Sequence, residues 1–236
     1  MILQPIVYGT LVRRYKRFLV DVQLDNPDRL ITAHCANPGA MLGLVKPGNQ
    51  VILSLSQNPK RKLPYTLQAI QTEGVWVGAN THLANELLAE SLATNSIPEL
   101  SCYPHIQREV KYGKNCRIDF LLSAPGLPDC YVEVKNVHLK RKSQAEFPDC
   151  MTARGTKHLT ELATLVEQGH RCVVVYVVQR HDCTGFQVAN DLDPSYAKAS
   201  QTAQDKGVET LAFSYQILPL QGVLTLGLYA VLPCAA

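Results

Sequence analysis

The sequence predicts an α/β protein with an all-β N-terminal domain over residues 1–80 and an α/β domain over residues 81–236. Short strand-like runs separated by turn signals fill the first part, whereas helix-like and strand-like runs alternate in the second. The charge changes at the same place. Residues 1–80 hold nine Lys and Arg against four Asp and Glu, a net of +5, and residues 81–236 hold fourteen against sixteen, a net of −2. This asymmetry indicates an anionic partner for the first domain.

The composition is that of a globular protein with a substantial core. Of its 236 residues, 46% are hydrophobic and 18% are charged, as in ordinary folded domains. No segment approaches the roughly 20 apolar residues of a membrane-spanning helix, and the first residues lack the basic and apolar regions of a secretory signal. We therefore expect a cytoplasmic protein that does not bind a membrane.

The eight cysteines are interpreted as reduced structural thiols. None forms a C-x-x-C pair, and no two histidines have metal-ligand spacing, which argues against a zinc site. Several cysteines lie in or beside apolar runs, where a free cysteine behaves as a small hydrophobic residue.

Short strands account for the first domain. In the second of them Phe18, Val20, Val22 and Leu24 lie on one face, and Leu19, Asp21 and Gln23 lie on the other, which is typical of a half-buried strand. Breaks rich in Pro, Gly, Asn and Asp separate the runs. Five or so short strands at this spacing predict a small closed barrel of the OB-like kind. The expected strands are 6–12, 17–24, 29–35, 50–54, 65–71 and 74–79.

The second domain begins with an expected helix over 81–94, whose apolar stripe would contain Leu83, Leu87, Glu90 and Thr94. Three strands follow at 106–112, 117–122 and 130–137, the first two joined by a tight hairpin at 113–115. A second helix over 153–168 has an N-cap at 152 and a glycine C-cap at 169. The run 171–178 is apolar on both faces, as in a buried central strand. Beyond it we expect a helix at 195–206, a strand at 209–215, and a closing hairpin or irregular tail at 216–232.

The most informative charged residues, Asp119, Glu133 and Lys135, lie inside apolar strand-like runs. Glu133 and Lys135 are two apart and therefore point to the same face of their strand. The turn-rich connector at 123–129 can fold this strand back beside the one that carries Asp119. We expect the three charges to meet on one sheet face, where burial is costly without a partner or a metal ion.

Two carboxylates and a lysine are what metal-assisted phosphodiester hydrolysis needs. In this interpretation Asp119 and Glu133 bind Mg²⁺ or Mn²⁺, with the backbone carbonyl of Val134 as a possible third ligand. Lys135 orients or helps to deprotonate the attacking water. The alternative is a structural ion-pair cluster, which is a weak device for stability.

Further polar residues could support this site. Glu90 could add a carboxylate from the first helix, or be a solvated helix residue. Glu109 could support the metal site or pair with Arg117 across the hairpin. Arg154 and His158 are four apart near the start of the second helix, where they and the helix N-terminus could bind a phosphate. Their alternatives are a surface arginine and a core histidine.

The run Arg13, Arg14, Tyr15, Lys16 and Arg17 interleaves four cations with an aromatic residue. Such a run can hold phosphates while the tyrosine stacks on a base. The alternative is a solvated charged turn.

Several short motifs occur along the chain. They are YGTL at 8–11, RYKRF at 14–18, HCANPGAM at 34–41, EVKYG at 109–113, RIDF at 117–120, EVKNV at 133–137, FPD at 147–149 and TARGTKH at 152–158. The order of elements, with Asp in the second strand and Glu-x-Lys in the third, resembles the αβββαβ core of PD-(D/E)xK nucleases. The motifs resemble, in order, those of the sugar fermentation stimulation protein (SfsA) family.

The resemblance implies a basic OB-like domain, a PD-(D/E)xK nuclease-like domain, and DNA binding linked to control of sugar (maltose) metabolism. It also promotes Asn37, in a loop that its spacing identifies only as a turn, to a nucleic-acid-binding candidate. We expect DNA or RNA as the partner. Two hypotheses stay open: Mg²⁺-dependent phosphodiester hydrolysis, or a non-catalytic DNA-binding transcriptional regulator on a nuclease fold.

Other function classes find little support. No helix-turn-helix is recognisable, which argues against a conventional repressor. A sugar or small-molecule enzyme is not indicated, because there is no Gly-rich phosphate loop and no nucleophile elbow.

Overall fold

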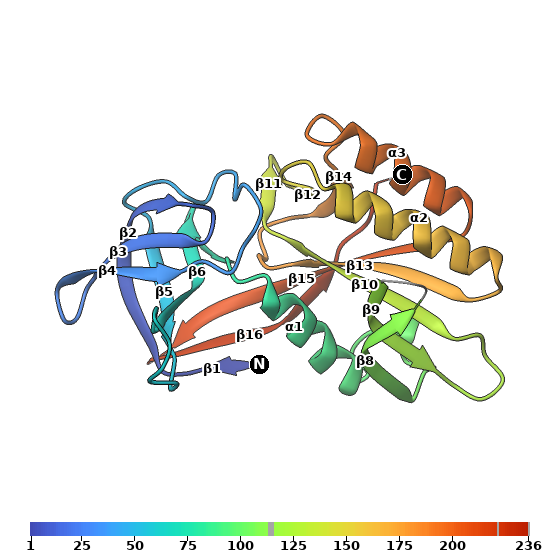
Figure 1. Cartoon of the computed structure of the whole chain (residues 1–236), viewed down its shortest axis with the longest axis horizontal. Helices are drawn as coiled ribbons and strands as arrows, with labels where there is room; N and C mark the ends of the chain where they lie inside the picture. The colour runs from blue at the N-terminus through green and yellow to red at the C-terminus, as the bar shows by residue number, and fades with distance from the viewer. Residues whose placement is uncertain (113–115, 221, 236) are drawn as a thin grey trace.

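Two units lie side by side in the computed structural model, which describes residues 1–112, 116–220 and 222–235 (Figure 1). One is a small β-barrel and the other is a mixed sheet with helices on both faces. None of the helices in these ranges is long and apolar enough to cross a membrane. The eight cysteines, all within these ranges, are free.

The barrel has the strand arrangement of an OB fold, which confirms the sequence prediction. Its sheet runs in the order β4-β3-β2-β5-β6-β7, and a further pairing of β4 with β6 closes the first five strands. Apolar residues on the inner side, among them Leu11, Val22, Leu53 and Leu67, form a separate core. The strands are β2 (Ile6–Tyr15), β3 (Leu19–Leu24), β4 (Arg29–His34), β5 (Gln50–Leu55), β6 (Tyr65–Thr72) and β7 (Val75–Gly78).

Phe18 differs from the prediction, because β3 begins one residue after it. Lys16 and Arg17 have φ angles of 46° and 64°, so the chain reverses there in a left-handed conformation before the strand starts. Phe18 is therefore 44% exposed, while Val20, Val22 and Leu24 are buried as expected.

A seven-stranded sheet in the order β1-β16-β15-β13-β10-β9-β8 forms the second unit. β10, β13 and β15 are parallel neighbours, and the outer strands run antiparallel. β13 is almost wholly buried, as expected for a central strand. The strands are β1 (Ile2–Leu3), β8 (His105–Tyr112), β9 (Cys116–Ser123), β10 (Cys130–Val137), β13 (Arg171–Val178), β15 (Glu209–Leu220) and β16 (Val223–Val231).

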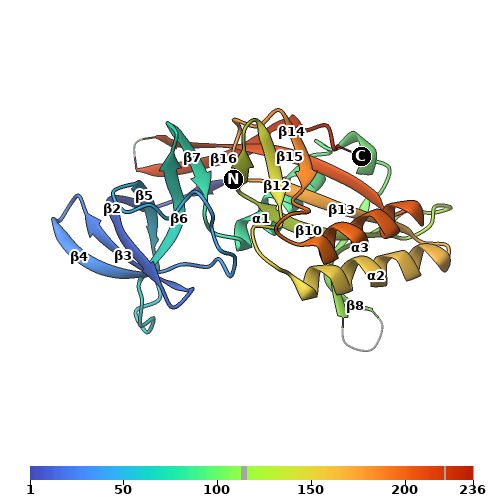
Figure 2. The same cartoon turned by 90° about the horizontal axis from the view of Figure 1, so that it is seen from above.

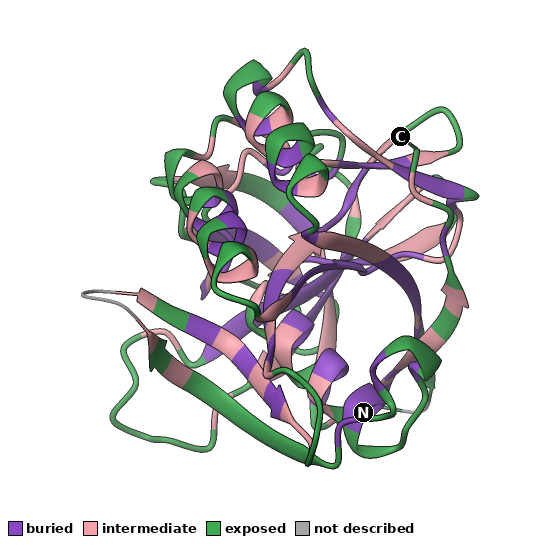
Figure 3. Cartoon of the chain, turned by 90° about the vertical axis from the view of Figure 1, so that its right-hand side faces the viewer, coloured by how far each residue is buried: buried purple, intermediate pink, exposed green. Residues whose placement is uncertain are grey.

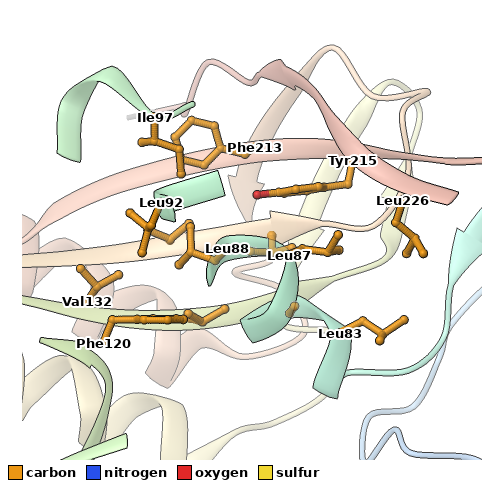
Figure 4. Packing of buried hydrophobic residues seen from close by; sticks show 14 of the residues in the cluster. Leu83, Leu87, Leu88, Leu92, Ile97, Phe120, Val132, Phe213, Tyr215 and Leu226 are labelled. Atoms are coloured by element: carbon orange, nitrogen blue, oxygen red, sulfur yellow. The ribbon is translucent and has the colours of Figure 1, made fainter. Parts of the chain in front are cut away.

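Helices cover both faces of this sheet. α1 (His82–Ala93) packs on one face with Phe120, Val132 and Tyr215 (Figure 4). α2 (Ala153–Glu167) and α3 (Pro194–Asp205) pack on the other face against Val174 and Tyr176. Figure 3 shows the exposed residues of the helices on their outward sides, with the central strands buried. The order α1, β8, β9, β10, α2, β13 reproduces the predicted αβββαβ core.

The stripe that α1 buries is not the predicted one. Leu83 and Leu87 face the core, but Glu90 and Thr94 are exposed, and the stripe continues instead through Ala84, Leu88, Ser91 and Leu92.

In α2 the expected cap is confirmed, because the Thr152 hydroxyl accepts a hydrogen bond from the Gly155 N–H at 3.1 Å. Gly169 follows this helix with φ of 91°, as a C-cap glycine does.

Some short elements were not expected from the sequence. β11 (Leu139–Arg141), β12 (Gln144–Phe147) and β14 (Gly185–Val188) form a small separate sheet, and η1 (Pro98–Leu100) follows α1. The expected strand at 209–215 extends to Leu220, and the segment after it is a hairpin rather than an irregular tail. β1 pairs with β16 in the second unit, although the division at residue 80 assigns it to the first. The hairpin expected at 113–115 lies outside the described residues.

The two units are joined by buried polar contacts and by the β15–β16 hairpin, which extends along the barrel (Figure 2). The Gly78 N–H donates to the Gln179 carbonyl at 2.8 Å, and the Gln179 amide donates to the Asn80 carbonyl at 3.0 Å. A Cβ atom at Gly78 would lie 2.1 Å from the Gln179 side chain, so this contact requires glycine. The Ile6 N–H also donates to the Gly222 carbonyl at the hairpin turn. These contacts hold the barrel in a fixed orientation.

Candidate functional site

The candidate site forms where β9 and β10 separate. The two strands pair from Cys130 with Leu122 to Val132 with Phe120, and the pairing then ends. Beyond this last pair, the Val134 N–H donates to Oδ2 of Asp119 at 2.7 Å instead of to a backbone carbonyl of β9. The Asp119 carboxylate thus occupies the opening between the strands, next to Glu133.

Asp119 is held by hydrogen bonds to both of its oxygens. Besides the Val134 N–H, the Asn85 amide of α1 donates to Oδ1 at 2.8 Å. Burial, and after it the charge of Glu133, raises the pKa of Asp119 to about 6. Two carboxylates with this mutual repulsion are better accommodated when a proton or a cation lies between them.

Glu133 is 3% exposed and has two nitrogen partners on one oxygen. The Lys135 ammonium donates to Oε1 at 2.6 Å, and His158 Nδ1 makes a hydrogen bond to the same atom. Burial acts to raise the pKa of Glu133, but the hydrogen bond to His158 and the charge of Lys135 outweigh it and leave the pKa below its ordinary value. Glu133 therefore stays ionised at neutral pH.

α2 directs Arg154 and His158 toward this carboxylate, as the i, i+4 spacing predicts. Arg154 Nε donates to His158 Nε2 at 3.3 Å, so the neutral ring carries its proton on Nδ1 and donates it to Glu133. His158 is buried, whereas Arg154 is exposed at the start of the helix. The guanidinium can thus bind a ligand while it orients the histidine.

The donor set suits a hard divalent cation. Within the described ranges no three His, Cys, Asp or Glu side chains are arranged to hold a metal ion. Asp119 and Glu133 nevertheless provide one half-buried and one buried carboxylate, and backbone carbonyls, water and phosphate can supply the further oxygens that Mg²⁺ accepts. The mutual repulsion of the two carboxylates gives such a cation a favourable position.

Glu90 is not part of this site, which corrects the prediction. Its side chain is half exposed and accepts a hydrogen bond from the Met1 ammonium at 2.6 Å. The residue of α1 that reaches the site is Asn85, which sequence reasoning missed. Asn85 carries no charge and therefore did not stand out as a candidate ligand. The one signal in the sequence was its place in the helix, next to Ala84 and three residues before Leu88, both of which are buried.

Glu109 lies on β8, which borders β9 on the side away from β10, and it faces the position of Asp119. β8 and β9 pair on both sides of this position, but Glu109 itself is unpaired and has φ of 54°. The expected ion pair with Arg117 is not found among the described residues. The neighbouring Arg108 instead donates to both carboxylate oxygens of Glu86 on α1.

The basic run of the barrel divides into residues with side-chain partners and residues without them. Arg13 donates to Asp21 at 2.7 Å, and the Tyr15 hydroxyl donates to the same carboxylate at 3.1 Å, so the hydroxyl of the half-buried Tyr15 is tied to the barrel. Lys16 and Arg17 are exposed, with no side-chain partner in the part of the chain that the structure describes. These two cations are therefore available to an anionic ligand.

Arg14 and Asn37 have structural roles. The Arg14 guanidinium donates to the carbonyls of Asn37, Gly39 and Ala40. Asn37 is 1% exposed, accepts from the Gly39 N–H at 2.9 Å and donates to the Ala79 carbonyl at 3.2 Å. The prediction that Asn37 contacts nucleic acid is wrong, because its side chain is buried and bonded to Gly39 and Ala79.

Comparisons with known proteins match both units. A model described as the SfsA N-terminal OB domain matches residues 12–79, and one described as the sugar fermentation stimulation protein RE domain matches residues 82–221. A sugar fermentation stimulation protein homolog from Rhodospirillum centenum is 54% identical over 217 residues, 91% of this chain and 92% of the relative. One from Roseobacter denitrificans is 51% identical over 224 residues, 94% of this chain and 95% of the relative.

A solved structure has the same fold. SfsA from Pyrococcus furiosus, described in complex with Ca²⁺, superposes with a TM-score of 0.89 and covers 100% of this chain and 98% of its own. Its sequence is 24% identical to this one. At that identity the likeness concerns the fold alone.

Proposed function

The chain belongs to the sugar fermentation stimulation protein family, and on that premise we propose that it is a metal-dependent enzyme that hydrolyses phosphodiester bonds of DNA or RNA, in a role linked to sugar (maltose) metabolism. One observation carries the proposal. Two carboxylates, the half-buried Asp119 and the buried Glu133, adjoin each other beside the Lys135 ammonium where two strands separate.

Asp119 and Glu133 would hold Mg²⁺ or Mn²⁺, together with the backbone carbonyl of Val134. The Ca²⁺ complex of the relative from Pyrococcus furiosus supports a site for a cation that prefers oxygen ligands. When bound, such a cation supplies positive charge at the scissile phosphate and at the attacking water.

Lys135 is the residue of this chain best placed to act on the reacting atoms. Its ammonium lies 2.6 Å from Glu133 and has further N–H bonds for a water molecule or a phosphate oxygen. It can orient the water and offset the negative charge that develops on the phosphate. His158 keeps the Glu133 carboxylate in place, and Arg154 can bind a non-bridging phosphate oxygen.

The test is cleavage of labelled single-stranded, double-stranded and branched DNA and of RNA, with and without Mg²⁺. We expect Mg²⁺-dependent cleavage by the wild type and none by Asp119→Asn. Cleavage that is equal in the two proteins would show that the site lies elsewhere or that the preparation contains another nuclease.

One observation favours a second candidate, a non-catalytic DNA-binding regulator. The charge of Glu133 is already offset by the Lys135 ammonium, and His158 makes a hydrogen bond to the same oxygen, without any metal ion. In a regulator this cluster would only stabilise the fold. Tight DNA binding by the wild type, with no cleavage of any of these substrates and no Mg²⁺ binding, would establish that function instead.

A further inference from the structure

The turn between β2 and β3 presents two cations and an aromatic side chain to solvent. Lys16 and Arg17 adopt left-handed backbone conformations, which residues other than Gly, Asn and Asp rarely do. Arg14 Nε donates to the Arg17 carbonyl at 3.1 Å and holds the turn in this form. Phe18, at the end of the turn, is 44% exposed. Backbone strain that is fixed in this way is typical of functional sites.

A relay of hydrogen bonds fixes this turn relative to the second unit. Arg14 donates to the carbonyls of Asn37 and Gly39, each at 2.8 Å. The same loop continues to Met41, whose N–H donates to Oδ2 of Asp149 at 2.6 Å. Asp149 also contacts His138 at 3.0 Å, three residues after Lys135 in the chain. The barrel turn is thus connected to the strand that carries the carboxylate site.

Close packing supports the same relay. A Cβ atom at Gly39 would lie 2.6 Å from Asp149, so the loop reaches the second unit because this residue is glycine. Arg14, which holds the Arg17 carbonyl, also donates to the Ala40 carbonyl at 3.1 Å. Ala40 directly precedes Met41, which is hydrogen-bonded to Asp149, so the barrel turn is linked to the segment that leads into α2.

Apolar side chains are exposed along this junction. Met151, directly before the cap of α2, is 80% exposed, and Leu42 of the barrel loop is 41% exposed. Exposed apolar side chains that share a junction with the cations Arg17 and Arg154 suit a ligand with apolar faces and negative charge. Arg154 then follows Met151 on the first turn of α2 and contacts His158.

We propose that these residues form one binding track for a single-stranded segment of nucleic acid, which the barrel turn and the α2 start guide to the carboxylate site. The proposal rests on the function proposed above and names the form of its substrate. The track consists of Lys16, Arg17, Phe18, Leu42, Met151 and Arg154.

The composition of the track favours a single strand over a duplex. The cations hold phosphates, and the exposed apolar side chains contact the faces of unpaired bases. In a duplex the bases are stacked on each other and offer only their edges in the grooves, so Phe18 and Met151 would face phosphates that they cannot bind. RNA and DNA single strands share this chemistry.

The experiment measures binding without cleavage, in EDTA, by fluorescence anisotropy. The probes are a labelled mixed-sequence DNA strand of about 16 nucleotides and the duplex formed with its complement. The variants are Phe18→Ala and Met151→Ala. Matched controls are Tyr229→Ala and Leu220→Ala on the β15–β16 hairpin, which remove side chains that are 56% and 59% exposed away from the track. Thermal unfolding checks that each variant is folded.

We expect the wild type to bind the single strand at least about tenfold more tightly than the duplex. Each track variant should lose about tenfold in affinity for the single strand, as the removal of a stacking side chain does. The control variants should bind like the wild type. Equal affinity for strand and duplex, or unchanged binding by both track variants, would overturn the proposal.

The same proteins separate this proposal from the enzymatic one. Cleavage that Asp119→Asn abolishes, together with unchanged binding by both track variants, overturns the track and keeps the hydrolase. Single-strand binding that depends on Phe18 and Met151, without Mg²⁺-dependent cleavage by the wild type, keeps the track and overturns the hydrolase.

Discussion

Lys135 donates a 2.6 Å hydrogen bond to Glu133, which precedes it by two residues on the same strand. The pair realises the side-chain alternation of a strand, since residues two apart share a face. It also shows that the site contains its own positive charge. A divalent cation would therefore enter a cluster of two carboxylates and one ammonium, rather than a purely acidic pocket.

Substitution of Glu133 by Gln should abolish Mg²⁺ and Mn²⁺ binding while the protein stays folded. The change keeps the shape of the side chain but removes half of the carboxylate charge available to a cation. Isothermal titration calorimetry measures the binding. Glu90→Gln is the matched control and should bind like the wild type, because Glu90 contacts the Met1 ammonium instead. Equal affinity in Glu133→Gln and the wild type would mean that Glu133 is not a ligand.

Lys135→Ala should lower the rate of phosphodiester cleavage by about two or more orders of magnitude, because it removes the positive charge next to the reacting phosphate. Nucleic-acid affinity should change little, since the change leaves the exposed cations Lys16, Arg17 and Arg154 in place. Single-turnover cleavage and anisotropy titrations give the two quantities. Lys142→Ala, which alters an exposed lysine at the β11–β12 turn, serves as the control. A cleavage rate unchanged by the loss of Lys135 contradicts its role.

Asp119 should make stability depend on pH between about 4 and 7. Its pKa is raised by burial, then by Glu133, from 3.8 to about 6, so the folded protein binds this proton more tightly than the unfolded chain does. The stabilisation is present below pH 3.8 and is lost as the pH rises through about 6. Two pKa units correspond to about 3 kcal/mol. Denaturant unfolding at several pH values in this range gives the free energy of unfolding. It should fall with rising pH more in the wild type than in Asp119→Asn. If the two proteins have parallel pH profiles, Asp119 does not contribute this dependence.

Arg14→Ala should destabilise the barrel by about 2–3 kcal/mol, because it leaves three partly buried carbonyls without their charged donor. Arg14→Lys should recover little of this, since an ammonium cannot reproduce the planar fork of the guanidinium. Arg13→Ala is the control and should cost far less, because Arg13 is largely exposed. Chemical denaturation measures the differences. If Arg13→Ala and Arg14→Ala have equal free energies of unfolding, the contacts of Arg14 with the carbonyls do not stabilise the barrel.

Much of the architecture could be predicted from the sequence, because its signals are local. Turn residues at regular spacing predicted the barrel, and the change of hydrophobic period at Asn80 predicted the second unit. The grouping of Glu133 and Lys135 followed from strand alternation alone. β1 and the small sheet of β11, β12 and β14 were missed, since strands of two to four residues carry almost no periodic signal.

The errors in the site concern residues whose exposure depends on tertiary contacts. Glu90 was assigned by a helical stripe that is rotated relative to the buried one, and the rotation depends on how α1 packs on the sheet. Asn37 lies in a polar loop that looked accessible but is enclosed by Ala79 and Arg14. Tyr15 was expected to stack on a base, yet Asp21 holds its hydroxyl, and the exposed aromatic residue of the turn is Phe18.

The pairing of β1 with β16 has a consequence for biosynthesis. Ile2 pairs with Thr225 and Leu3 with Leu224, so this contact joins residues that are more than 200 positions apart in the chain. The barrel strands β2–β6 are close together in the chain and can pair early during synthesis, but the edge of the large sheet must wait until β16 has been made. Until then the segment before Ile6 has no partner strand in this sheet. Closure of this edge is therefore a later step in folding than closure of the barrel.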